Sequence, residues 1–487
     1  MVAAPSSSDL ARLGDQALGA GQRDAAIAYY QAALAIDPTM ATIWYNLGWA
    51  LRAARQFDGA LHAYGEALRY GVARPEEVML NRAAILGDHL FQSEAAEAEL
   101  RAVLVRAPQF VPAWLNLGTL HEDRGEADAA RAAYHHALAL TPNLGRAHAR
   151  LAMIDLADGQ ISIARAAVEV AIGQAHSHED LAEILYAKAA TLDADHEYGA
   201  AFETLIEANA MGHANAPASY DAVAHEQLVT QVINAFPEPL SFDVPITDVG
   251  PKPIFIVGMF RSGSTLIEHY LARHPAIRSG GELEFIPATS QITLAPYPES
   301  LRALDTGAVV ALRVAYLDEM RRIAPTGWTT DKRCDNVLHL GLIRTLFPEA
   351  PIIHTVRDPL DTLLSVLFLH FGEAVSYGFD QRDAAHYYIQ YRRLVDHWRR
   401  IYPDVMIDVD YDQLVRDRDT QIAPVFDRLG LKAGDLSIDA GMKGQSVRTA
   451  SSWQVRKPLH QKSSGRWRNY AQQLEPARQM LKDTGLI

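Results

Sequence analysis

The sequence predicts an α-solenoid of repeated helical hairpins followed by an α/β domain with a central parallel sheet. In the first part, small and aromatic residues recur with a period of about 34 residues, which is typical of paired helices stacked in an array. After Pro253, apolar strands alternate with helices, which indicates a parallel sheet with ligands at the carboxyl ends of its strands. We therefore predict a solenoid over 1–211, a helical and Pro-rich connection over 212–252, and an α/β domain over 253–487.

Three segments carry the repeat most clearly: "AAIAYYQAALAIDP" (25–38), "GALHAYGEALRYG" (59–71) and "AARAAYHHALALTP" (129–142). Each has a small residue, an aromatic residue four positions later, and Ala three positions after that. The equivalent positions are Ala26, Ala60 and Ala130, Tyr30, Tyr64 and Tyr134, Trp44 and Trp114, Gly48 and Gly118, and Pro38, Pro108 and Pro142. We expect the alanines to let the two helices of a hairpin approach closely, and the tyrosines to fill the space toward the next hairpin.

This pattern resembles the tetratricopeptide repeat, and weaker copies extend it to five or six hairpins. Such solenoids bind extended peptides or other proteins, so the resemblance implies a peptide or protein partner. We expect the repeats to leave the second domain intact when they are removed, so that a chain beginning near Ser219 still binds its ligand.

Composition and charge exclude several classes of protein. The formal net charge of -14 argues against non-specific nucleic-acid binding, which needs an excess of Lys and Arg. The single Cys334 excludes an intrachain disulfide, and no apolar run reaches the roughly 20 residues of a membrane span. The N-terminal "MVAAPSSSDLARLGDQAL" lacks the basic and apolar segments of a secretory signal, so we expect a cytoplasmic location without a membrane span.

The stretch "PIFIVGMFRSGSTLIEHYLARHP" (253–275) predicts an anion site. An apolar strand runs into a loop of Gly, Arg and Ser and then into a helix, so backbone N–H groups and the helix dipole converge on one point. A kinase or NTPase would need lysine at position 264, where this chain has Ser264. The loop residues that we expect to hold the anion are Arg261, Ser262, Gly263, Ser264 and Thr265.

A second concentration of positive charge lies near the C-terminus. Between Lys443 and Gln473 there is no acidic residue, although the chain as a whole is acidic. The basic residues of this run are Lys443, Arg448, Arg456, Lys457, Lys462, Arg466 and Arg468. The run predicts a local anion site, with a solvated loop as the alternative.

Together these segments resemble the sulfotransferases that use 3′-phosphoadenosine 5′-phosphosulfate (PAPS), and among them the tyrosylprotein sulfotransferases. The similarity covers roughly 253–290, 328–370 and 405–470. It implies a P-loop-like sulfotransferase domain that transfers a sulfuryl group from PAPS to a hydroxyl acceptor and releases adenosine 3′,5′-bisphosphate. It implies no metal, and no spacing among the histidines resembles a metal site.

The resemblance assigns catalytic roles to two segments. "HPAIRSGGELEFIP" (274–287) matches the family segment whose second acidic residue is the catalytic base, which implies that role for Glu282, with Glu284 as the alternative. "TTDKRCDN" (329–336) implies that Lys332 stabilises the transition state, although Cys334 stands where proline is usual. Arg261 is implied in both donor binding and catalysis.

The donor site follows from three further segments. "VRDPLDTLLS" (356–365) implies that Arg357 and Ser365 bind the 3′-phosphate, and "DVDYDQLV" (408–415) implies that Tyr411 contacts the adenosine. "SSWQVRKPLHQKSSGRW" (451–467) implies that Ser451 acts in the transition state. In the same segment Lys457 and Arg466 are implied in donor binding.

The acceptor remains open at this point. One hypothesis is tyrosine in a peptide or protein gathered by the repeats; a saccharide, a lipid or a small phenol are alternatives. A nucleotide-binding scaffold without activity is a further alternative, which the joint presence of Arg261, Glu282, Lys332, Arg357 and Ser451 disfavours. Whether the chain forms a homodimer is likewise open.

Overall fold

The computed structural model describes residues 5–175, 177–216, 219–243, 250–369, 372–432 and 463–487. The chain folds into two compact units, Met1–Pro142 and Asn143–Ile487. The domain limits after residues 211 and 252 remain predictions. In the described part of the chain, no helix combines the length and apolar character that a membrane crossing requires.

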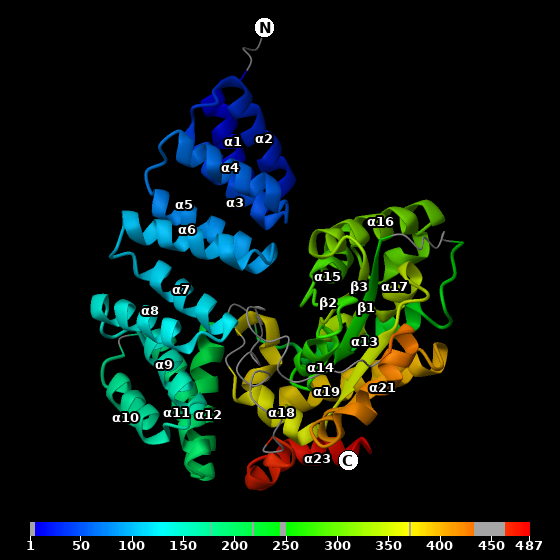
Figure 1. The fold of residues 1–487 in the computed structure, drawn as a ribbon. Helices are drawn as coiled ribbons and strands as arrows, with labels where there is room; N and C mark the ends of the chain where they lie inside the picture. The colour runs from blue at the N-terminus through cyan, green and yellow to red at the C-terminus, as the bar shows by residue number, and fades with distance from the viewer. Residues whose placement is uncertain (1–4, 176, 217–218, 244–249, 370–371, 433–462) are drawn as a thin grey trace. The chain divides into compact units, whose positions relative to one another are not determined.

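The first unit consists of helices that pair as successive hairpins (Figure 1). Its helices are α1 (Ser7–Gly19), α2 (Arg23–Ile36), α3 (Ala41–Ala53), α4 (Phe57–Arg69), α5 (Pro75–Ala84), α6 (Ser93–Arg106), α7 (Val111–Arg124) and α8 (Ala127–Leu140), with a π-helical turn at Ile85–His89. The predicted alanines are buried in these helices: Ala26, Ala60 and Ala130 are each fully enclosed. The repeat predicted from the sequence is therefore confirmed.

The repeat tyrosines also pack within their own hairpins. A Cβ atom added at Gly48 of α3 would lie 2.6 Å from ring carbons of Tyr64 in α4, so the ring lies against the first helix of its own hairpin. Gly118 has the same relation to Tyr134. Because only glycine leaves room for the ring, the Gly and Tyr marks of the repeat form one packing pair.

The second unit begins with two more hairpins and a single helix. These are α9 (Gly145–Ala157), α10 (Ile161–Ile172), α11 (His178–Ala194), α12 (Tyr198–Asn215) and α13 (Ala222–Ala235). The last of them lies within the connection over 212–252, which was expected to contain a helix.

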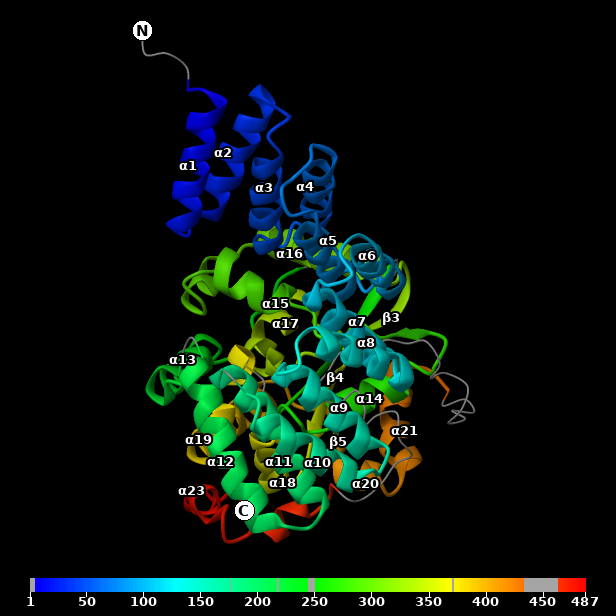
Figure 2. The ribbon, with the colours of Figure 1, turned by 90° about the vertical axis from the view of Figure 1, so that its left-hand side faces the viewer.

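A five-stranded parallel sheet follows, with strand order β2-β3-β1-β4-β5. The strands are β1 (Pro251–Gly258), β2 (Ile277–Arg278), β3 (Gly327–Asp331), β4 (Ile352–Val356) and β5 (Met406–Asp410). The helices around them are α14 (Ser264–Leu271), α15 (Phe285–Ala288), α16 (Thr306–Ile323), α17 (Leu340–Leu346), α18 (Pro359–Leu367), α19 (Gln381–Ile401), α20 (Tyr411–Leu414), α21 (Arg418–Leu429) and α23 (Glu475–Asp483). Figure 2 shows this unit from a second direction.

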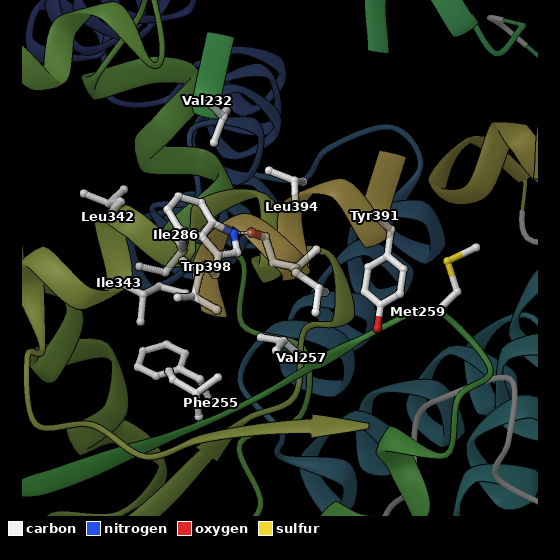
Figure 3. Close-up of a cluster of buried hydrophobic side chains, with 14 of the residues drawn as sticks. Val232, Phe255, Val257, Met259, Ile286, Leu342, Ile343, Tyr391, Leu394 and Trp398 are labelled. Atoms are coloured by element: carbon white, nitrogen blue, oxygen red, sulfur yellow. Dashed lines mark hydrogen bonds between the residues drawn. The ribbon is translucent and has the colours of Figure 1, made fainter. Parts of the chain in front are cut away.

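Helices cover both faces of the sheet because β1 is apolar on both sides. Phe255 and Val257 point into the larger core with α13, α16, α17 and α19, whereas Ile254 and Ile256 pack against α14 and α21. In the larger core the Trp398 indole is fully buried and donates to the carbonyl of Val337 at 2.8 Å (Figure 3). Continuous apolar runs of this kind are typical of strands in a sheet that is covered on both faces.

Helices α11 and α12 belong to the same compact unit as the sheet. They form an apolar cluster with α18 and the C-terminal segment; its members include Leu185, Phe202, Leu205, Leu364, Leu367, Tyr470 and Leu474. Asn209 of α12 is buried in this contact, where it accepts from Tyr186 Oη at 2.6 Å and donates to the Leu367 carbonyl at 3.3 Å. The last repeat-like hairpin thus packs on the α/β fold as a core element.

Candidate active site

The loop between β1 and α14 adopts a backbone that favours glycine. Gly258 and Gly263 have φ values of 157° and 104°, and Arg261 has a φ of 72° although it is not glycine. A Cβ atom at Gly263 would lie 2.7 Å from Cδ2 of Tyr411, so the Tyr411 ring lies directly against the loop. The loop leads directly into the N-terminus of α14, as expected for an anion site.

The hydroxyl groups of this loop have protein partners. Ser262 Oγ donates to the Met259 carbonyl at 2.5 Å and lies 2.6 Å from Thr355 Oγ1 of β4. Ser264 Oγ lies 3.1 Å from the Sγ atom of Cys334, and both groups are buried. Burial raises the pKa of the Cys334 thiol to about 11, so it remains protonated beside the loop.

Two arginines converge behind the loop. Arg357 follows β4 and donates through Nη1 to the Arg261 carbonyl at 3.0 Å, while Arg261 donates through Nε to Ser365 Oγ at 3.0 Å. The Arg357 guanidinium also lies 4.7 Å from the centre of the Tyr411 ring. The structure therefore brings together Arg261, Arg357, Ser365 and Tyr411, four residues from three separate segments of the sequence.

The electrostatics of these arginines favour an anion. Burial, together with the charges of Arg357 and Arg466, lowers the pKa of Arg261 to about 10. In addition, the Nε atom of Arg357 is buried and has no hydrogen-bond partner among the described residues. Clustered guanidinium groups of this kind gain most from a phosphate or sulfate, which accepts several N–H bonds at once.

Lys332 and Glu282 form an ion pair on the other side of the loop. Lys332 directly follows β3; its side chain is 1% exposed, and Nζ contacts Glu282 Oε1, whose side chain is 38% exposed. Burial disfavours the ammonium, but the charges of Glu282 and Glu268 outweigh this effect and raise the pKa of Lys332. Lys332 therefore carries its charge inside the protein, next to a carboxylate that reaches solvent.

Glu284, the alternative base, has different neighbours. Its carboxylate lies 3.7 Å from Arg333 Nη1, and Arg333 in turn lies 2.9 Å from Asp335 Oδ1. The two glutamates thus belong to separate ion pairs although they are two residues apart.

Glu268 is a site residue that the sequence reasoning missed. It lies on α14 with 6% exposure and accepts from Thr330 Oγ1 at 2.6 Å and from the Gly281 amide at 3.0 Å. The Lys332 amide donates to the Gly281 carbonyl at 2.7 Å, so Gly281 is fixed from both sides immediately before Glu282. A carboxylate within the apolar face of a helix was the signal in the sequence that could have revealed it.

The described end of the basic run, from residue 463 onward, is tied to α18. Asp361 accepts from the Gly465 and Trp467 amides at 2.5 and 2.8 Å, and the Trp467 indole donates to Asp358 at 3.1 Å. Arg357 Nη2 donates to the Ser463 carbonyl at 2.6 Å. These contacts fix the start of the segment against the arginine cluster.

The remaining predicted residues differ in their placement. Arg466 is paired with Asp193 of α11. Thr265 is buried in the first turn of α14. Ser451 and Lys457 lie outside the described residues, as do Lys443, Arg448, Arg456 and Lys462.

The strand order explains why residues so distant in the sequence meet. The chain adds β2 and β3 on one side of β1 and then crosses to add β4 and β5 on the other. Glu282 and Lys332 follow β2 and β3, whereas Arg357 and Tyr411 follow β4 and β5. The phosphate loop follows β1 between them, at the position where open α/β sheets bind ligands. Over the described residues, His, Cys, Asp and Glu form no group of three that could hold a metal ion.

Family models match both parts of the chain. Residues 253–435 match the sulfotransferase family, and residues 17–76 and 92–144 match tetratricopeptide repeat models. The chain joins tetratricopeptide repeats to a sulfotransferase domain.

Two curated proteins are similar to the chain. An uncharacterized protein of Aquifex aeolicus is 28% identical over 302 residues, which cover 59% of this chain and 39% of that protein. A protein-tyrosine sulfotransferase of Drosophila melanogaster is 26% identical over 242 residues, which cover 44% of this chain and 46% of that protein. The chain therefore spans less than half the length of either relative.

Among solved structures, the MamA protein is similar to part of the chain. The alignment has 19% identity, covers 34% of this chain and 91% of MamA, and has a TM-score of 0.32.

Proposed function

We propose that this chain transfers the sulfuryl group of PAPS to a hydroxyl acceptor, with tyrosine of a peptide or protein as the acceptor. The observation that carries the proposal is the meeting, at one edge of the sheet in the sulfotransferase domain, of a buried arginine pair and the Lys332–Glu282 ion pair. An anion-binding half and an acid–base half lie on either side of one phosphate loop.

The residues present fit a phosphorylated adenosine donor. Arg357 Nε is a buried N–H donor without a partner among the described residues, and a phosphate oxygen would satisfy it; Arg261 with Ser365 adds further donors beside it. The Tyr411 ring, held between Gly263 and Arg357, is suited to contact a nucleobase or ribose. When bound, PAPS supplies the sulfuryl group in an activated form.

Glu282 is proposed to take the proton of the acceptor hydroxyl. Its carboxylate is paired with the buried Lys332 and is still partly exposed, so an acceptor arriving from solvent can reach it. A positioned base typically contributes about 10² to 10⁴-fold to such a reaction.

Lys332 is proposed to offset negative charge that develops on the leaving oxygen. Its raised pKa keeps it protonated, and its burial makes the charge more effective than it would be in water. Arg261 is proposed to add charge from the loop side. Ser451 is proposed, by resemblance alone, to contribute in the same way.

Tyrosine as the acceptor rests on the similarity to the Drosophila protein-tyrosine sulfotransferase. The repeats support a peptide or protein partner, because stacked helical hairpins form extended binding surfaces. A saccharide, a lipid or a small phenol are the competing acceptors. Mass spectrometry of each acceptor class after incubation with PAPS, with an added sulfate as the readout, decides among them.

Donor binding tests the proposal first. Adenosine 3′,5′-bisphosphate, titrated calorimetrically into the protein in the presence of a chelator, is expected to bind, because guanidinium and amide donors hold the phosphates. Arg357→Ala is expected to weaken binding by about tenfold or more, equivalent to about 1.4 kcal/mol or more. Arg399→Ala is the matched control, since it removes the same charge from a surface pair with Asp408.

Two results would contradict the proposal. One is undiminished affinity in the Arg357→Ala protein. The other is binding that appears only when Mg²⁺ is added.

A further inference from the structure

A carboxylate of α11 contacts the segment that borders the arginine cluster. Asp193 accepts from Arg466 Nε at 3.2 Å, and its other oxygen lies 3.0 Å from Arg466 Nη2. The Tyr470 hydroxyl also donates to Asp193, at 2.5 Å. Asp193 therefore receives three donors from two residues that are more than 270 positions away in the sequence.

Packing restricts the geometry of this ion pair. The Arg466 guanidinium lies 4.3 Å from the centre of the Phe368 ring. Tyr470 is fully buried and contacts Tyr198, Phe202 and Phe368 at ring distances of 5.4 to 6.0 Å. The Arg466 and Asp193 side chains retain only 23% and 21% exposure. Removing two charges from water is costly, so a pair this enclosed is poorly explained as a device for stability.

Arg466 lies next to the donor-binding half of the site. Its neighbours Gly465 and Trp467 donate their amides to Asp361, and nearby Ser463 accepts from Arg357. The charge of Arg466 contributes to the lowered pKa of Arg261, so the two guanidinium groups are within electrostatic reach of each other. Asp193 takes the Nε and Nη2 edge of Arg466, and a guanidinium has five N–H donors in total.

We infer that Asp193 is a positioning residue for donor binding: it holds one edge of the Arg466 guanidinium so that the remaining N–H groups face a donor phosphate. Helices α11 and α12 then form part of the donor site, in addition to any role in recruiting a partner. This inference rests on the proposed function. It differs from simple charge neutralisation, because a carboxylate that only neutralised Arg466 would weaken the binding of an anion.

The two explanations predict opposite changes for Asp193→Asn, which keeps the shape of the side chain and removes its charge. If Asp193 positions Arg466, the Kd for adenosine 3′,5′-bisphosphate rises by about three- to tenfold, as is typical when a charge-assisted hydrogen bond is lost. If Asp193 only neutralises charge, binding becomes tighter. Unchanged or tighter binding in a folded protein overturns the inference.

A double-mutant cycle separates positioning from a general structural effect. In an Arg466→Gln protein, the Asp193→Asn change is expected to leave the Kd unaltered, because Asp193 acts through Arg466. An equal loss in both backgrounds overturns the inference. Asp195→Asn is the matched control: this carboxylate lies two residues further along, is 45% exposed and pairs with Arg165.

Two controls test whether each variant folds and whether the proposed function itself holds. Thermal unfolding reports on the fold of each variant; should Asp193→Asn fail to fold, Asp193→Glu is measured in its place, with a weaker affinity expected because the charge is kept but displaced. Arg357→Ala distinguishes the two proposals. If it leaves the affinity unchanged, the proposed function fails; if it weakens binding while Asp193→Asn does not, only the role of Asp193 fails.

Discussion

At the residue scale, Glu282 and Glu284 have the same side chain but different ion-pair partners. Glu282 pairs with the buried Lys332 beside the phosphate loop, whereas Glu284 faces Arg333 and Asp335. Glu282 therefore joins its carboxylate to a cation that directly follows a strand of the sheet. This difference in partners favours Glu282 as the base.

Glu282→Gln is expected to slow single-turnover sulfuryl transfer by about 10²-fold or more, because the amide keeps the shape of the side chain but cannot accept a proton. The affinity for adenosine 3′,5′-bisphosphate should change little. Glu284→Gln is the matched control and is expected to stay near the wild-type rate. The assignment is wrong if the Glu284 change abolishes transfer and the Glu282 change does not.

The buried carboxyl group of Asp331 makes the stability of the protein depend on pH. It is completely buried beneath the site, accepts from Tyr316 Oη at 2.9 Å, and has an Oδ1 atom without a hydrogen-bond partner in the described structure. Burial raises the pKa of Asp331 from about 3.8 to about 8. Because the folded state binds this proton more tightly than the unfolded state, stability should fall as the pH rises from about 4 to about 8.

Asp331→Asn is expected to remove this pH dependence, since the amide stays neutral and still accepts from Tyr316. Within the window the wild-type protein should lose up to about 1.4 kcal/mol of stability per pH unit relative to the variant. Thermal unfolding at several pH values between about 5 and about 8, which lie within this window, measures the stability of both proteins. Asp318→Asn, at an exposed ion pair with Arg321, is the control; equal slopes for wild type and Asp331→Asn would contradict the prediction.

The residues that the sequence predicted are those with a local pattern around them. Arg261 stands in a Gly and Ser loop after an apolar strand, and Arg357 directly follows another strand, so their meeting at one edge follows from parallel pairing. Glu268 has only a weak signal, a carboxylate within the apolar face of a helix, and Asp193 has no such pattern. The role of Asp193 depends on which distant segment packs against it, and spacing along the chain carries no information about that.

At the scale of elements, the repeat depends on contacts between glycine and tyrosine. Gly48 of α3 and Gly118 of α7 each lie against the ring of a tyrosine in the second helix of the same hairpin. Both rings are fully buried. The hairpin therefore closes to a distance that a side chain on the first helix would prevent.

Gly48→Ala is expected to destabilise the protein by about 1–3 kcal/mol, because the new methyl group overlaps the Tyr64 ring. This cost exceeds the gain of about 1 kcal/mol from replacing glycine by alanine within a helix. Thermal unfolding followed by far-ultraviolet circular dichroism measures the change. Gly19→Ala is the control, since no atom lies within 4 Å of its added Cβ; the prediction fails if the two variants unfold alike.

Elements with a strong period were predictable, and short ones were not. The apolar runs at 254–257 and 352–356 lie in β1 and β4. Strand β2 has two residues, Ile277 and Arg278, which is too short for any alternation to appear. Its existence depends on pairing with β3, an interaction that only the folded sheet supplies.

At the scale of the whole molecule, the last repeat-like hairpin is part of the sulfotransferase unit. Leu364, Leu367 and Tyr470 bury their side chains against α11 and α12. The sequence could not separate this hairpin from the others, because its apolar positions have the spacing of a repeat whether they face another repeat or an α/β domain. From the sequence alone, a chain that begins at Ser219 is expected to bind its ligand. The structure leads us to expect that it does not.

Removal of Met1–Pro142 is expected to leave the affinity for adenosine 3′,5′-bisphosphate unchanged, because Asn143–Ile487 is a compact unit that contains the whole described site. A chain that begins at Ser219 is expected to lose this binding or to aggregate, since it exposes the cluster around Tyr470 and removes the partner of Arg466. Calorimetry and light scattering on both chains provide the test. Wild-type affinity in a soluble chain that begins at Ser219 would contradict the prediction.

The strand order has an evolutionary consequence. The central β1 divides the sulfotransferase sheet so that Glu282 and Lys332 are encoded before residue 340, while Arg357 and Tyr411 are encoded after it. Under the proposed function, the first stretch of the gene carries the phosphate loop and the residues that meet the acceptor, and the second carries the other residues that hold the donor. Selection can then diversify what is sulfated through mutations around Glu282 and Lys332, while purifying selection preserves the phosphate loop and the later donor residues.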